Sequence, residues 1–229
     1  MIDILLRAKE LGNLVWLYVF AFIIAVLVAM CSHEYAHAKV AYNCGDETPR
    51  LMGRMTLNPL RHYDILGLLC FLVVGFGWAK PVPINSRNFK EYRKGIFLTS
   101  VAGITTNFVI CFFSCGLSVL MSFILTFVES IEWLSYIIFF FALTFSFMAQ
   151  INFSLCVFNL LPIYPLDGFN IVSSLTKSDN SFVNFMRRYG SIILLIIILT
   201  GVFGLGMQYL VNYVLMPINA FWSKIIFGV

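Results

Sequence analysis

The sequence predicts an all-α membrane protein with about four transmembrane helices plus a re-entrant or interfacial element with a short β segment. Of its 229 residues, 60% are hydrophobic and only 11% are charged, and the mean hydropathy is +0.90. Soluble domains carry about a quarter charged residues, so this composition excludes an ordinary soluble protein. We find no internal repeat and no linker that divides the chain.

Four apolar runs are long enough to cross a bilayer at about 1.5 Å per residue. They cover residues 11–30, 95–128, 133–161 and 191–213. The first run continues as an apolar helix to Val40, past any plausible signal-peptide cleavage site, so we predict that it is retained. Residues 214–229 hold Pro217, Trp222 and Lys224 and are expected to lie at the membrane interface.

The region between the first two runs has a different character. Glycine and proline punctuate it, which predicts a loop with a short strand at residues 51–57. The apolar stretch at residues 65–78 is too short to cross, so we expect it to be re-entrant or interfacial. Pro81 and Pro83 then impose an extended backbone on residues 80–85. An extended peptide could pair with that segment as an added strand, although a plain connector explains it equally well.

Basic residues predict the orientation of the chain. They are concentrated between the first and second runs, and Lys177, Arg187 and Arg188 lie between the third and fourth, whereas the loop between the second and third runs has none. By the positive-inside rule both basic regions are cytoplasmic, and both termini lie on the outer side of the cell membrane. The net charge of +4 then reflects loops near anionic lipid, and not binding of nucleic acid.

The chemistry of the chain is expected at the end of the first apolar helix, in His33-Glu34-Tyr35-Ala36-His37. Residues four apart lie one helical turn apart on the same face, so His33 and His37 can direct imidazole nitrogens at one divalent metal. Glu34 lies on the flank of that face, where it can take a proton from a water without binding the metal. This spacing is typical of zinc hydrolases. Ionisable residues are costly in an apolar helix and mark functional sites there.

A catalytic zinc takes three protein ligands and leaves one position open. The first and third runs both end on the cytoplasmic side, and the third leads into residues 159–168, where Asp167 is the only carboxylate. Asp167 can therefore meet His33 and His37 without crossing the bilayer. Capping of the next helix is an alternative role for Asp167, and it does not exclude ligation.

The other candidate ligands have structural explanations. The six cysteines include no Cys-x-x-Cys pair, so we interpret them as small buried hydrophobic residues without a disulfide framework. His62 lies in a basic loop near Asp64, and we interpret it as a surface residue or as a support for the site.

These motifs resemble those of the site-2 protease family, the intramembrane zinc metalloproteases, and in particular its small members without a PDZ or CBS domain. The similarity extends from about residue 27 to residue 175. It rests on residues 33–37, 53–59 and 77–83, on Ala102-Gly103 with Asn107, and on residues 159–168. Two departures concern the local backbone and no ligand: Ile104 and Tyr164 stand where the family usually has proline.

The resemblance implies one site-2 protease-like domain over residues 1–229, with a core at about 11–176 and accessory C-terminal helices at 189–229. It also implies one zinc ion per chain, and it gives each candidate residue a role. The implied metal ligands are His33, His37 and Asp167, and the implied catalytic residues are Glu34 as general base and Asn159 as a donor to the oxyanion.

The expected function is zinc-dependent intramembrane endopeptidase activity on peptide bonds in or near the transmembrane segments of membrane proteins. The expected partners are a membrane protein substrate with a transmembrane helix and the lipid bilayer, with the active site toward the cytoplasmic side. A catalytically silent binding protein is an alternative. A metal transporter is a further alternative, but a transporter would normally show repeats and further polar residues that line a path.

Overall fold

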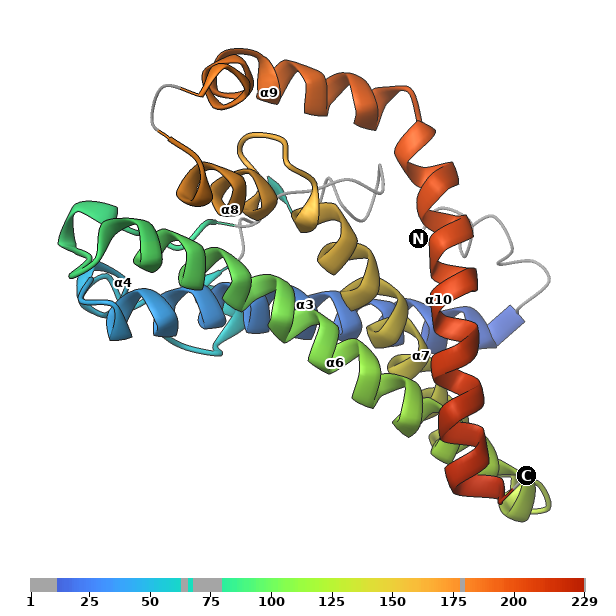
Figure 1. Cartoon of the computed structure of the whole chain (residues 1–229). Helices are drawn as coiled ribbons and strands as arrows, with labels where there is room; N and C mark the ends of the chain where they lie inside the picture. The colour runs from blue at the N-terminus through green and yellow to red at the C-terminus, as the bar shows by residue number, and fades with distance from the viewer. Residues whose placement is uncertain (1–11, 63–65, 68–79, 178–179, 229) are drawn as a thin grey trace.

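The computed structural model describes residues 12–62, 66–67, 80–177 and 180–228, and its regular elements there are all helical. Three long helices, α3 (Val15–Asn43), α6 (Tyr92–Val128) and α7 (Glu132–Leu160), pack together as the body of the protein (Figure 1). The short helix α8 (Asp167–Leu175) follows α7, and α9 (Ser181–Leu199) and α10 (Val202–Phe227) complete the chain. The remaining short turns are η1 (Gly12–Leu14), α4 (Thr48–Leu51), η2 (Pro59–Arg61) and η3 (Ser86–Asn88).

A stripe of small residues sets how closely the helices pack around α3. Ala21, Ala25 and Ala29 are fully buried at intervals of four residues, and the same interval continues through His33, His37 and Ala41. Residues four apart are neighbours on one helical face. Small side chains let neighbouring helices approach closely in a membrane protein. The two histidines therefore lie on the buried seam between helices.

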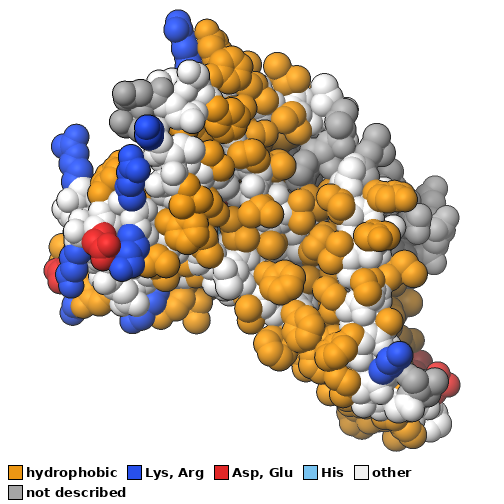
Figure 2. All heavy atoms as spheres, in the orientation of Figure 1, with side chains coloured by type: hydrophobic (Ala, Val, Ile, Leu, Met, Phe, Trp, Pro, Cys, Tyr) orange, Lys and Arg blue, Asp and Glu red, His pale blue; other side chains and the backbone are white. Residues whose placement is uncertain are grey.

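The outer surface is suited to lipid. Large apolar side chains are exposed along the long helices, including Trp16, Phe113, Ile137, Leu195 and Tyr213. In Figure 2 hydrophobic side chains cover the visible face of α10, whereas Lys and Arg gather near α4 and the start of α6. Five of the described helices, α3, α6, α7, α9 and α10, are long and apolar enough to cross a membrane.

The expected strand at residues 51–57 is wrong. The segment begins in α4, which has Pro49 in its first turn, and Gly53 then turns the backbone with φ of +64°. Further on, Asn58 accepts a hydrogen bond from the Leu60 backbone and starts η2. A Pro-started turn, a left-handed glycine and a capped turn leave no run of residues long enough for a strand. The expected re-entrant element at residues 65–78 falls almost entirely outside the described residues.

The expected continuous span at residues 191–213 is also wrong, because the chain breaks at Gly201. Gly201 has φ of +69°, a conformation that glycine adopts readily, and it separates α9 from α10. The helix that was expected to begin at residue 191 begins at Ser181, where Asn180 accepts hydrogen bonds from the Phe182 and Val183 backbones. Residues 214–227, expected at the interface, continue α10.

Helix α10 belongs to the packed core. Its Met207 and Leu215 are buried against Cys111 and Cys115 of α6 and against Ala149 and Phe153 of α7. The Trp222 indole donates a hydrogen bond to the Phe112 carbonyl at 3.0 Å and lies against Gly116. Cys44, Cys111, Cys115 and Cys156 are free thiols.

Candidate metal centre

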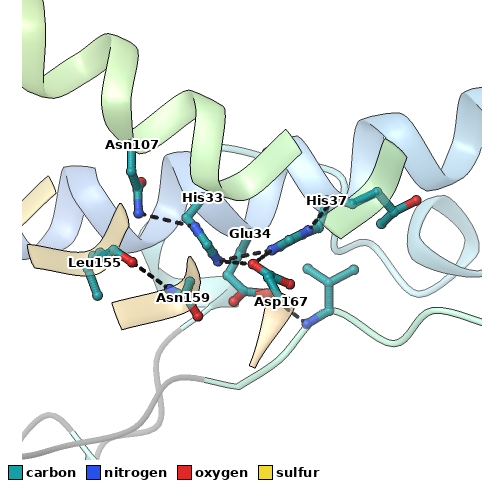
Figure 3. Close-up of polar contacts among 9 residues, drawn as sticks. His33, Glu34, His37, Asn107, Leu155, Asn159 and Asp167 are labelled. Atoms are coloured by element: carbon teal, nitrogen blue, oxygen red, sulfur yellow. Dashed lines mark hydrogen bonds and ion pairs between the residues drawn. The ribbon is translucent and has the colours of Figure 1, made fainter. Parts of the chain in front are cut away.

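Three of the predicted site residues meet in one place (Figure 3). His33 and His37 come from the buried stripe of α3, and Asp167 is the first residue of α8. The Nε2 atoms of the two histidines are 2.9 Å apart, and Asp167 Oδ2 lies 3.4 Å from His33 Nε2 and 3.2 Å from His37 Nε2. The three potential ligand atoms therefore lie within 4.8 Å of one another. The two histidines share α3, and α8 is far from it in the sequence, so only the fold brings Asp167 to them.

Helix α6 orients both histidine rings through contacts with their Nδ1 atoms. His37 Nδ1 donates a hydrogen bond to the Thr99 carbonyl at 2.8 Å. The Asn107 amide lies 3.2 Å from His33 Nδ1, and its oxygen is buried without another partner. The Asn107 atom in this contact is the side-chain nitrogen; when the amide is turned over, its oxygen accepts from a protonated Nδ1 of His33. Both rings then carry their proton on Nδ1 and present the Nε2 lone pair to the centre.

This arrangement fits a metal ion. Burial acts to raise the pKa of Asp167, but contacts with the two histidines lower it to about 2, so the group is an anion at neutral pH. A cation would take the place of these histidine N–H donors, because rings protonated on Nδ1 present two imidazole lone pairs beside the carboxylate, and Asp167 Oδ2 is a buried oxygen without a hydrogen-bond partner among the described residues. Acceptor atoms in such contact repel one another unless a cation lies among them. Two histidines and one carboxylate are ligands that Zn²⁺ commonly takes.

Gly103 makes this close packing possible. A Cβ atom at Gly103 would lie 2.5 Å from His37 Nε2 and 2.6 Å from His33 Cε1. Thr99, Gly103 and Asn107 recur every four residues and so form one face of α6 that covers the two histidines. The resemblance to site-2 proteases included Gly103 and Asn107 without giving them a role, and it did not include Thr99. The four-residue interval between Gly103 and Asn107 would have pointed to Thr99, because Thr99 lies one such interval before Gly103.

Glu34 lies beside the three ligand atoms and is held by the backbone of the segment that precedes α6. Its Oε2 accepts a hydrogen bond from the Val82 amide at 2.9 Å (Figure 3). Glu34 is absent from the group of three convergent ligand atoms. Its other carboxylate oxygen has no hydrogen bond to any described residue.

Asn159 lies in the last turn of α7, close to the same centre. Its side-chain amide donates to the Leu155 carbonyl at 3.0 Å (Figure 3), which uses one of its two N–H groups. Asn159 lines a cavity of about 540 Å³ together with Glu34, His33, His37 and Asp167. Pro81, Val82 and Ile84 form part of another wall, so the segment expected to have an extended backbone does border the site. Cavities of this size are typical of ligand sites.

Asp46 anchors residues 80–85, here called the Val82 segment, to the end of α3. This role of Asp46 was not anticipated from the sequence. The carboxylate is fully buried and accepts hydrogen bonds from the Asn85 amide at 2.7 Å and the Asn88 side chain at 2.8 Å. It also accepts from the Thr48 backbone and hydroxyl. Burial acts to raise the pKa of Asp46, but these hydrogen bonds outweigh it and hold the pKa below its usual value. Asp46 thereby fixes the segment that reaches Glu34.

His62 has a structural role in the same loop region. It is fully buried, so the expected surface position is wrong. Its ring contacts the Thr56 carbonyl at 2.7 Å, and its own carbonyl accepts from the Lys80 amide at 2.8 Å. These contacts join the described loop after α3 to the start of the Val82 segment.

Comparison with known proteins identifies the family. Residues 21–199 match peptidase family M50. The chain belongs to peptidase family M50. This match spans the helices that carry all five predicted site residues, and it confirms the resemblance to site-2 proteases. No solved structure matches the chain.

Individual relatives agree with the family. The chain is 38% identical over 179 residues to "Putative zinc metalloprotease YwhC" of Bacillus subtilis, covering 78% of this chain and 80% of that protein. It is 26% identical over 193 residues to "Putative zinc metalloprotease Rip2" of Mycolicibacterium smegmatis, covering 80% of this chain and 69% of the relative. The Rip2 protein of Mycobacterium tuberculosis H37Rv is 28% identical over 172 residues, which are 61% of its length.

Family and structure together establish the class of this M50 protein. It is a multi-pass membrane protein of the site-2 protease type, and its predicted activity as a zinc metalloendopeptidase is confirmed at the level of the family. Zn²⁺ is the metal of this class, and the His33, His37 and Asp167 atoms offer a place for it.

Proposed function

We propose that the chain cleaves peptide bonds in or next to the transmembrane helices of other membrane proteins, at the 540 Å³ cavity over the metal centre. The observation that carries this proposal is the convergence of three acceptor atoms, from His33, His37 and Asp167, which α6 keeps in the form that can bind a metal. These three residues would hold one zinc ion per chain.

The roles of the remaining residues follow from their positions. When bound, zinc supplies Lewis-acid polarisation and makes water more acidic. Glu34 has one oxygen free among the described contacts, so it can take a proton from the attacking water and pass it to the departing amine. The Val82 amide holds Glu34 in place by its hydrogen bond to the other oxygen. Asn159 retains one N–H group for the oxyanion that forms on the substrate.

The substrate must be unwound where it is cleaved. Helical hydrogen bonds occupy the carbonyl oxygens of a transmembrane segment and shield the carbonyl carbons from attack. We therefore propose that substrate helices with easily frayed segments are preferred, and that the unwound stretch lies along the wall formed by Pro81, Val82 and Ile84.

We further infer four membrane crossings, with α9 and α10 together making the fourth. Later residues of α10 meet later residues of α6: Trp222 stacks near Phe112, and Phe227 near Phe123. Helix α10 therefore runs in the same direction as α6. If α9 crossed the bilayer completely, α10 would have to return against α6, so α9 and α10 cannot each be a full crossing in succession.

This topology supports one domain with the centre on the cytoplasmic side of the cell membrane. The catalytic end of α3 and the start of α6 lie near the basic side chains (Figure 2), which the positive-inside rule assigns to the cytoplasm. We propose that residues 1–229 form one domain, with a core of about 11–176 and accessory helices over 189–229. The packing of Met207 and Leu215 of α10 on α6 and α7 supports a single unit.

The test uses the purified chain in detergent, a panel of transmembrane peptides and the variant Glu34→Gln. We expect one zinc per chain in both proteins, zinc-dependent cleavage by the wild type, and no cleavage by the variant. Glu47→Gln is the matched control, because Glu47 is an exposed carboxylate outside the cavity. The Glu47→Gln protein should cleave normally.

Other outcomes would identify the alternatives. Zinc bound by both proteins with no cleavage of any peptide would contradict the proposal and favour a binding protein. Zinc flux into proteoliposomes that survives Glu34→Gln would instead indicate a transporter.

A further inference from the structure

Arg187 of α9 is the only lysine or arginine among the described residues that line the cavity over the metal centre. The carboxylates there are Glu34, which accepts from the Val82 amide, and Asp167, which lies beside the two histidines. Arg187 forms no ion pair with any carboxylate in the described part of the chain. A guanidinium that borders a substrate cavity without a partner is available to an incoming anion.

The fold directs Arg187 toward the cavity. Val183 and Gly190 are the buried residues of α9, and Arg187 lies between them at intervals of four and three residues, on the same helical face. Gly190 is packed so closely on Tyr164 that a Cβ would lie 2.9 Å from its Cβ and carbonyl oxygen. This contact fixes α9 to the loop that leads into Asp167, and α9 passes over α8 (Figure 1).

The surroundings of Arg187 suit a carboxylate. Asn170 of α8 also lines the cavity, and its side-chain N–H groups can donate to an anion, whereas the Ser173 hydroxyl already donates to the Asn170 carbonyl. The planar guanidinium binds carboxylates with two parallel hydrogen bonds. The neighbouring Arg188 is different: it lies over the Tyr189 ring at 5.5 Å and is absent from the cavity wall.

We propose that Arg187 selects membrane protein substrates that carry an acidic side chain close to the cleaved bond. This inference rests on the proposed peptidase function and names a substrate class for it. An exposed arginine and carboxylate attract each other modestly, so we expect a preference of about five-fold rather than an absolute requirement.

The experiment uses a transmembrane peptide that is cleaved in phosphatidylcholine nanodiscs. A single Glu, Gln or Lys is placed in turn at each position flanking the cleaved bond, and kcat/KM is measured for the wild type, Arg187→Gln and Arg187→Glu, with Arg188→Gln as the matched control. Binding of the same fluorescent peptides to Glu34→Gln measures the preference without turnover. Amidated and free C-termini distinguish a side-chain carboxylate from a terminal one.

We expect the Glu peptide to be cleaved and bound about five-fold better than the Gln peptide at one or two positions. Arg187→Gln should remove this preference, Arg187→Glu should turn it toward Lys, and Arg188→Gln should leave it unchanged. Zinc-dependent cleavage without any charge preference would overturn the inference and leave the peptidase function standing. A preference lost equally in Arg188→Gln would also overturn it. So would an effect of Arg187→Gln that, when phosphatidylglycerol is added to the nanodiscs, follows the lipid content whatever the peptide.

Discussion

Replacing Gly103 with alanine should empty the metal centre while leaving the helices folded. The added Cβ would lie 2.5 Å from His37 Nε2, 2.6 Å from His33 Cε1 and 2.7 Å from His37 Cε1. Ordinary van der Waals contact begins at 3.4 Å, so a ring or α6 must move by about 0.9 Å. Metal sites tolerate about 0.2 Å in ligand distances. Misplaced ligand orientation alone costs about 10–100-fold in metal affinity, and we expect at least that loss.

The assay measures zinc per chain by elemental analysis after dialysis against a weak chelator, together with peptide cleavage and thermal unfolding in detergent. Gly116→Ala is the matched control on the same helix, since its Cβ would lie 2.7 Å from the Trp222 ring and far along α6 from the histidines. We expect Gly116→Ala to unfold at a lower temperature but to keep its zinc. A Gly103→Ala protein with one zinc and normal cleavage would refute the packing argument.

Three further predictions follow from the contacts around the centre. Asn107→Ala removes the partner of His33 Nδ1, so zinc affinity should fall about 10–100-fold in a competition titration, and an unchanged affinity would exclude the orienting role. Asn159→Ala should lower kcat about 100-fold or more while zinc content stays at one, and a normal kcat would remove Asn159 from the mechanism. Asp46→Asn should lower the free energy of unfolding at pH 7 by about 2–3 kcal/mol, because the substitution removes the charge-assisted hydrogen bonds of a buried carboxylate. The folded-state pKa of Asp46 is lowered, so the stabilisation is present above the unfolded pKa of about 3.9 and is lost as pH falls through the folded pKa. The wild type and Asp46→Asn should therefore become equally stable in acid, with Glu47→Gln unaffected throughout; a difference that persists at all pH values would contradict this assignment.

The convergence of His33, His37 and Asp167 was predictable from the sequence because it depends on helical spacing and on the order of the apolar runs. Helical spacing places His33 and His37 on one face, and the order of apolar runs brings Asp167 to the same side of the membrane. Composition likewise determined that the protein is helical and embedded in lipid. The catalytic roles of Glu34 and Asn159 stay predictions, although both side chains border the cavity.

Two elements were misjudged because hydropathy does not register backbone turns. The apolar run through Gly201 looks continuous, yet a left-handed φ at that glycine divides it into α9 and α10. The loop segment after α3 was expected to include a short strand at residues 51–57, but Pro49, Gly53 and Asn58 stabilise turns instead. In both places, residues with specific backbone preferences outweigh a pattern averaged over many residues.

Only the tertiary structure decided what surrounds the ligands. Thr99 and Asn107 orient the histidines, Asp46 holds the segment that donates to Glu34, and Gly190 brings Arg187 to the cavity. Each of these contacts joins residues more than 25 positions apart, so no local periodicity reveals it. The sequence by itself determined which groups can bind zinc, because that depends on residue type and helical spacing. The fold determined how they are oriented and what they face, because that depends on which helices pack together.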